Sequence, residues 1–156
     1  MGTRSGPSRR GTAEDAVDMA AEPYLARYSA GMPVLADAAR TGGRSAVVVR
    51  DLASGATWPW QRAADADLGY LVLAGCLEVR LAGRVEVAEP IALAHCPAGT
   101  AHRIRALTAV RLAVLVTPGG LEPFLVHGLP AAAADPALFL ALAQEHRVEV
   151  LPDLLP

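Results

Sequence analysis

His102 is the residue of this 156-residue chain that is best suited to chemistry. It follows the turn residues Pro97–Gly99 and opens the run HRIRA, in which apolar and charged residues alternate. In a β-strand this alternation places Ile104 on the face of His102, and Arg103 and Arg105 on the opposite face. An imidazole titrates near neutral pH, so an inward-facing His102 could act as a general acid or base. The alternative is a hydrogen-bonded barrel histidine without a catalytic role.

Three more candidate site residues, Asp65, Asp67 and Tyr70, lie in the segment Gly55–Gly75. Tyr70 shares strand parity with Leu68, so both side chains are expected to point inward. Tyr70 would then be a proton donor or a wall of a ligand site. Asp65 and Asp67 lie in the turn before this strand, where either could orient His102 or act as a base. Aspartate is also a common turn residue with no further role.

His95 and Cys96 are adjacent, so one of the two is expected to face the interior, and the sequence does not say which. A metal site built on His95 and His102 would need a third ligand that cannot be located in the sequence. Trp58 and Trp60 flank Pro59 and are expected to pack between sheets or subunits.

These residues belong to a series of short strand-like runs. Gly or Pro stands at almost every break between the runs, and no long helix interrupts them. This pattern predicts an all-β sandwich or barrel. The expected strands cover Ser45–Leu52, Gly69–Leu73, Cys76–Leu81, Val85–Val87, Ile91–Cys96, His102–Leu107 and Val110–Val116.

The N-terminal part has a different character. Residues Met1–Thr12 are rich in Gly, Ser and Arg and have no periodicity, which predicts a disordered tail. Residues Ala13–Tyr28 carry acidic side chains early and Arg27 late, as a short helix favours. Pro23 is expected to end or break that helix.

A second helix is expected near the C-terminus, over about 135–147. Asp135 stands where an N-cap should be and Pro136 at the first helical position. Leu138 and Leu142 lie at helical spacing, so their face should close one side of the barrel or form a subunit contact. The apolar tail Val148–Pro156 is expected to pack against the body or a partner subunit.

Composition excludes several classes of function. The net charge is −2, all 14 basic residues are Arg, and no electrostatic case for nucleic-acid binding exists. Without lysine, Schiff-base catalysis is impossible. No apolar run is long enough to span a bilayer and no signal-type segment follows the start. The two cysteines are expected to be free thiols in a cytoplasmic, single-domain protein of residues 13–156, with a disulfide as the alternative.

Two motifs resemble those of the cupins, which are small double-stranded β-helix barrels of the jelly-roll type. In the first, Gly55 is followed at the cupin spacing by Gln61, Ala63, Leu68 and Gly75. The family has two histidines and a glutamate where this chain has Gln61, Ala63 and Leu68. In the second motif Pro97, Gly99 and His102 match, whereas Ile91 and Ala106 replace a glycine and an asparagine. The resemblance is to quercetin-dioxygenase-type bacterial cupins and covers about 41–130.

The resemblance implies a metal site of three imidazoles and one carboxylate at these positions. Ala63 and Leu68 have no donor atom, and Gln61 is a weak neutral donor. We therefore expect no metal and no other cofactor, and dioxygenase activity is placed in doubt. Because the ligand positions converge in cupins, Gln61 is expected to lie beside His102.

The resulting hypothesis is a metal-independent enzyme that performs acid–base chemistry on a small organic, polyketide-like secondary metabolite. Cyclisation, dehydration and isomerisation are the expected reaction types. His102 and Gln61 are the predicted catalytic residues, and the protein is expected to be a homodimer. The alternatives are a non-catalytic small-molecule binder and a metal-dependent oxygenase with an altered ligand set. The predicted substrate-binding residues are Tyr70, Ala63, Leu68, Ile104 and Asp67.

Overall fold

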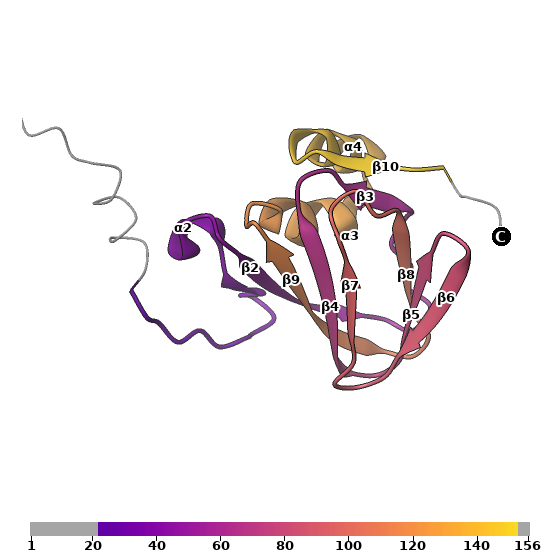
Figure 1. Cartoon of the computed structure of the whole chain (residues 1–156), viewed down its shortest axis with the longest axis horizontal. Helices are drawn as coiled ribbons and strands as arrows, with labels where there is room; N and C mark the ends of the chain where they lie inside the picture. Colours follow the sequence, from indigo (N-terminus) through magenta and orange to yellow (C-terminus); the bar gives the residue numbers. More distant parts are fainter. Residues whose placement is uncertain (1–21, 153–156) are drawn as a thin grey trace, which may run out of the picture.

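The computed structural model describes residues 22–152, which form two antiparallel five-stranded sheets. Figure 1 shows the strands of both sheets curving around a common core. The first sheet has the order β1 (Val34–Ala36), β2 (Ala46–Leu52), β9 (Val110–Thr117), β4 (Asp67–Ala74) and β7 (Leu93–Cys96). The second has the order β10 (Val148–Val150), β3 (Gln61–Ala63), β8 (His102–Ala106), β5 (Leu77–Leu81) and β6 (Arg84–Ala88).

The all-β prediction is therefore confirmed, and each expected strand is present with slightly shifted ends. The strands β1, β3 and β10 were not predicted, because each has only three residues and too short a pattern to stand out. Two of these unpredicted strands, β3 and β10, help to position the candidate site. β10 pairs with β3 along Gln61–Ala63 and so holds the strand that carries Gln61.

Strand alternation fills the space between the sheets with apolar side chains. Tyr70, Val72 and Leu112 of the first sheet are fully buried, as are Leu77 and Ile104 of the second. Burial of each aliphatic side chain of this size stabilises the fold by about 1.5–3 kcal/mol. The interior positions next to the site are thereby held by tight packing on both sides.

Short helices cover one end of the sheets. After α2 (Ala38–Thr41), the only other helical segments in the described residues are η1 (Phe124–Gly128), α3 (Leu129–Ala131) and α4 (Pro136–Glu145). In Figure 1, α4 and β10 lie across the end where β3 is found. The Asp135 carboxylate accepts a hydrogen bond from the Leu138 amide, as the predicted N-cap requires.

The predicted apolar face of α4 needs a correction. Phe139 and Ala143 are the buried residues of this helix, and the Phe139 ring lies 5.9 Å from that of Phe124 in η1. Leu142 packs half-buried against the core as predicted, but Leu138 is 44% exposed, so the centre of the buried stripe lies one residue further along the helix. The large Phe139 ring determines this shift, because it has more apolar surface to bury than Leu138.

The predicted N-terminal helix can be assessed only over its last residues. Residues 22–28 are not helical, which agrees with the expectation that Pro23 ends or breaks the helix. Tyr28 contacts the first sheet. The Tyr28 hydroxyl donates to Asp51, and the Arg111 guanidinium lies over the Tyr28 ring. The remainder of that helix and the predicted tail 1–12 lie outside the described residues.

Candidate functional site

His102 lies in the interior of the second sheet, where β8 runs between β3 and β5. It pairs with Gln61 on one side and with Leu81 on the other, and it is only 1% exposed. Its inward orientation and the outward orientation of Arg103 and Arg105 confirm the alternation predicted for this strand. The expected proximity of Gln61 and His102 is also confirmed, by their direct cross-strand pairing.

Both ring nitrogens of His102 have hydrogen-bond partners. Nδ1 lies 2.9 Å from the Thr100 carbonyl oxygen, and Nε2 lies 2.6 Å from the Tyr70 hydroxyl. A carbonyl oxygen can only accept, so Nδ1 must carry the proton. Nε2 is then the acceptor of the Tyr70 O–H. This arrangement assigns the tautomer of a neutral His102 with a basic nitrogen directed toward Tyr70.

Burial keeps both members of this pair uncharged. Removal from water lowers the pKa of His102, although the hydrogen bond to Thr100 opposes the change. Burial raises the pKa of Tyr70 well above its ordinary value, with a smaller contribution in the same direction from Cys96. At neutral pH the site therefore holds a neutral imidazole and a protonated phenol.

Gln61 completes the polar group. A side-chain hydrogen bond from Gln61 lowers the pKa of Tyr70, as expected when an amide N–H donates to the phenol oxygen. The amide oxygen, Oε1, is buried and has no hydrogen-bond partner in the described part of the chain. The hydrogen bonds thus form one chain, in which Gln61 donates to Tyr70, Tyr70 to His102 and His102 to the Thr100 carbonyl. The buried acceptor Oε1 of Gln61 stands at the start of this chain.

The structure does not bring the two aspartates to this group. Asp67 accepts a hydrogen bond from the Ala98 amide, and exposed Asp65 forms an ion pair with Arg147. The suggestion that either aspartate orients His102 is therefore wrong, because Thr100 and Tyr70 hold both ring nitrogens. Asp67 instead fixes the turn that precedes β8.

The other predicted site residues surround the polar group as apolar core. Ala63, Leu68 and Ile104 are each less than 5% exposed, and they face inward as expected. Trp58 was predicted to pack only between sheets or subunits. Its ring packs edge-on against the Tyr70 ring, with 6.2 Å between the ring centroids, so Trp58 also forms part of the immediate surroundings of the site.

The residues at the cupin metal positions do not fit a transition metal. Gln61, Ala63, Leu68 and His102 all point inward, but two of them carry no donor atom. The fourth, His102, already uses both nitrogens within the protein. No group of three or more His, Cys, Asp or Glu side chains in residues 22–152 is arranged to hold a metal ion.

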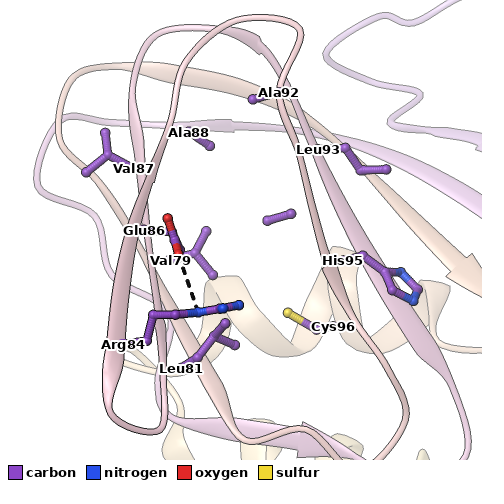
Figure 2. Close-up of a pocket in the computed structure, with 11 residues that line it drawn as sticks. Val79, Leu81, Arg84, Glu86, Val87, Ala88, Ala92, Leu93, His95 and Cys96 are labelled. Carbon is purple, nitrogen blue, oxygen red and sulfur yellow. Dashed lines mark ion pairs between the residues drawn. The ribbon is translucent and has the colours of Figure 1, made fainter.

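A groove opens between the edge strands β6 and β7, next to this buried group. Its volume is about 270 Å³. Leu81, which pairs with His102, and Cys96, which pairs with Leu68, form part of its lining. Figure 2 shows Cys96 pointing into the groove and His95 pointing away from it. None of the predicted substrate-binding residues lines this groove: Tyr70, Ala63, Leu68 and Ile104 lie in the core, and half-buried Asp67 holds the turn before β8.

The same view resolves the orientation of the adjacent pair. Cys96 is the inward-facing residue, 2% exposed, whereas His95 is exposed. A metal site that joins His95 to His102 is therefore wrong, because His95 lies on the outer face of the first sheet and His102 on the inner face of the second. Cys76 and Cys96 are both free thiols, and burial raises the pKa of Cys96 to about 11. The Cys96 thiol is thus protonated and unreactive at neutral pH.

The neutral state of His102 predicts how stability depends on pH. Its folded-state pKa is depressed below the ordinary 6.5, so the unfolded chain binds the proton more tightly. The corresponding stability is present above pH 6.5 and lost as pH falls through the folded-state pKa. Urea unfolding at pH 7.5 and 5.5 should show a larger loss for the wild type than for His102→Gln. Equal losses in the two proteins would contradict this assignment.

Comparison with known proteins agrees with the fold. No protein-family model matches the sequence, and neither does any curated protein. The structure is similar to that of KdgF from Halomonas sp., with a TM-score of 0.51 and 22% identity over 56% of this chain and 76% of KdgF. It is also similar to an uncharacterized conserved protein with a double-stranded β-helix domain from Klebsiella pneumoniae. There the TM-score is 0.50 and the identity 19%, over 77% of this chain and 93% of that protein.

These similarities show that the chain has the double-stranded β-helix fold of the small cupins, as its motifs predict. A further similar structure is the cupin domain of Schizosaccharomyces pombe Cnp3, with a TM-score of 0.46 and 22% identity over 51% of this chain and 57% of that one. Within residues 22–152 no helix has the length and apolar character needed to cross a membrane. The fold alone does not assign a reaction.

Proposed function

We propose that this protein is an enzyme that moves a proton on a small organic molecule without the help of a metal ion. The observation that carries the proposal is the buried hydrogen bond of 2.6 Å between Tyr70 and Nε2 of His102. Burial keeps His102 neutral at physiological pH, which is the protonation state required of a general base. It also keeps Tyr70 protonated, as a hydrogen-bond donor must be.

The reaction would begin when a substrate carbonyl oxygen takes over the hydrogen bond of the Tyr70 hydroxyl. Nε2 of His102 is then free to accept a proton from the carbon next to that carbonyl. The C–H bond breaks, an N–H bond forms, and the electron pair moves onto the carbonyl oxygen as an enolate. The Tyr70 O–H and the Gln61 amide would stabilise this enolate. The imidazolium, held through Nδ1 by Thr100, returns the proton at another position.

This chemistry suits enolisable carbonyl compounds, of which polyketide-like secondary metabolites are one kind. Isomerisation, dehydration and cyclisation all begin with such a proton transfer. The groove between β6 and β7 is the proposed entrance, since its lining residues Leu81 and Cys96 pair with His102 and Leu68 next to the polar group. These two side chains must move aside for a substrate to reach Nε2. We expect Ala63, Leu68 and Ile104 to form the apolar wall around the reacting carbon.

We also expect the protein to act as a homodimer in the cytoplasm. Several large apolar side chains are exposed on the single chain, as is common where a partner subunit packs. Leu25 is 77% exposed and Ile91 83%, which supports the proposal of a subunit contact.

A second function is favoured by a different observation. Gln61, Tyr70 and His102 are each no more than 1% exposed, as expected of a polar group that only stabilises the barrel. The protein would then be a non-catalytic binder that retains a small molecule in the groove unchanged. The donor set at the cupin metal positions argues against the third alternative, a metal-dependent oxygenase.

Solvent deuterium exchange distinguishes these functions. Protein freed of metal by chelation is incubated in D₂O with a panel of small enolisable ketones and β-keto acids, and deuterium incorporation is followed by NMR. We expect accelerated exchange of the hydrogens next to a carbonyl for at least one compound. Binding without exchange would support the non-catalytic function instead. Activity that appears only after Fe, Ni, Cu or Mn is added would overturn metal independence.

A further inference from the structure

The groove between β6 and β7 combines an apolar lining with one basic and one acidic side chain, Arg84 and Glu86. Val79 of β5 and Ala92, Ala94 and Cys96 of the opposite side supply apolar surface. Arg84 of β6 is the one lysine or arginine that lines it. Figure 2 shows the Arg84 side chain extending across the groove toward Cys96.

Arg84 reaches the groove because of its register. It pairs with Leu81 across the β5–β6 turn, and Leu81 faces the interior beside His102. Residues that face each other across a strand pair point to the same side of the sheet. The guanidinium therefore projects from the interior face of an edge strand into the groove.

The guanidinium has capacity for a further partner. Among the described residues its only ion pair is between Nε and a Glu86 oxygen, at 3.4 Å. The two side chains are 65% and 57% exposed, so the pair is weak and screened by water. A guanidinium has five N–H donors in a planar fork, which matches both oxygens of a carboxylate. Glu86 engages only one of these donors.

We propose that the groove binds a small, mainly apolar carboxylate, with Arg84 as its anion-binding residue. The inference rests on the proposed function, because the bound molecule would be the substrate on which His102 acts. Its carboxylate meets the Arg84 guanidinium, and its apolar part lies on Val79, Ala94 and Cys96. The end of the molecule remote from the carboxylate then lies against Leu81, which pairs with His102 and must move aside before that end reaches Nε2.

The size of the groove limits the ligand. Its volume of about 270 Å³ is slightly below the roughly 300–1,000 Å³ typical of pockets for drug-sized ligands. A single aromatic or short aliphatic acid fits this space, whereas a long acyl chain or a nucleotide does not. The exposed Glu86 at the rim disfavours molecules with a second negative charge.

Three probes of similar size test the charge requirement. Phenylacetate, phenylacetamide and phenethylamine share an apolar body and differ in carrying a negative, no or a positive charge. Dissociation constants are measured by chemical-shift titration of ¹⁵N-labelled protein. We expect phenylacetate to bind about tenfold more tightly than phenylacetamide, as a charge-assisted bidentate contact provides. Equal affinities, or a preference for phenethylamine, would overturn the proposal.

Variants locate the binding. Arg84→Gln should abolish the preference for phenylacetate, whereas Arg105→Gln, an exposed arginine on the outer face of β8, should retain it. Ala94→Leu should weaken the binding of both the acid and the amide by filling the groove. Undiminished phenylacetate binding in Arg84→Gln, or in Ala94→Leu, would place the probe elsewhere and overturn the proposal.

His102→Gln separates this inference from the proposed function. If both are correct, this variant loses deuterium exchange and still binds phenylacetate with wild-type affinity. If phenylacetate binding depends on Arg84 but the wild-type protein catalyses no deuterium exchange, the enzymatic function is refuted and the carboxylate site stands. If the wild-type protein catalyses exchange but its binding of phenylacetate does not depend on Arg84, the carboxylate site is refuted and the enzymatic function stands.

Discussion

Replacement of His102 by alanine is expected to abolish turnover of any substrate found by deuterium exchange. Nε2 is the only basic nitrogen in contact with Tyr70 among the described residues, so no other group there can take the proton. Loss of a general base lowers kcat by about 10²–10⁴-fold. The measurement is the initial rate of exchange, with circular dichroism as evidence that the variant is folded. We also expect a loss of about 2–4 kcal/mol in the free energy of unfolding, from the cavity and the lost hydrogen bonds.

A second substitution separates chemistry from folding. His102→Gln retains most of the side-chain volume and an oxygen that can accept a hydrogen bond from the Tyr70 hydroxyl. Unlike imidazole, however, an amide does not titrate near neutral pH. The variant should therefore be more stable than His102→Ala and equally inactive. His127→Ala, at an exposed position of η1, serves as the control and should keep full activity. Wild-type exchange rates in His102→Gln would show that His102 is not the base.

Replacement of Gly75 by alanine is expected to have the largest effect on stability. Gly75 lies in the turn between β4 and β5, with φ of 82°. A Cβ atom here would lie 2.1 Å from the Ala109 carbonyl oxygen, a backbone atom that cannot move aside cheaply. The left-handed conformation costs a non-glycine residue about 1–2 kcal/mol, and the clash adds to this cost. We expect a total loss of more than about 3 kcal/mol in urea unfolding.

Gly83 provides the matched control. It also has a positive φ, of 74°, but a Cβ atom there would have no neighbour within 4 Å. Gly83→Ala should therefore cost only the conformational part, about 1–2 kcal/mol. The difference between the two variants measures the contact between the turn at Gly75 and the turn at Ala109. Equal losses for both variants would show that this contact can relax and is not tight.

This contact also bears on the site. Gly75 follows the strand that carries Tyr70, and Ala109 follows the strand that carries His102. A displacement of the two turns would separate the ends of these strands. Partly folded Gly75→Ala protein should therefore lose the Tyr70–His102 hydrogen bond before it loses its strands, because the bond depends on alignment within a few tenths of an ångström.

The amino-acid sequence by itself determined which face each site residue takes. A strand alternates with period two, so Tyr70 had to share the side of Leu68, and His102 the side of Ile104. Local pattern was sufficient for these two predictions because parity depends only on neighbours along the chain. The expectation that Gln61 and His102 lie side by side came instead from the resemblance to cupins, and the structure pairs them directly.

Tertiary structure decided which groups meet across the barrel. The bond between Tyr70 and His102 joins strands of different sheets, and no periodicity within one strand indicates such a partner. The inward orientation of Cys96, the exclusion of both aspartates and the position of Arg84 in the groove likewise depend on register between strands. Register is set by the packing of the whole core, so the sequence could supply the candidate residues but not their contacts.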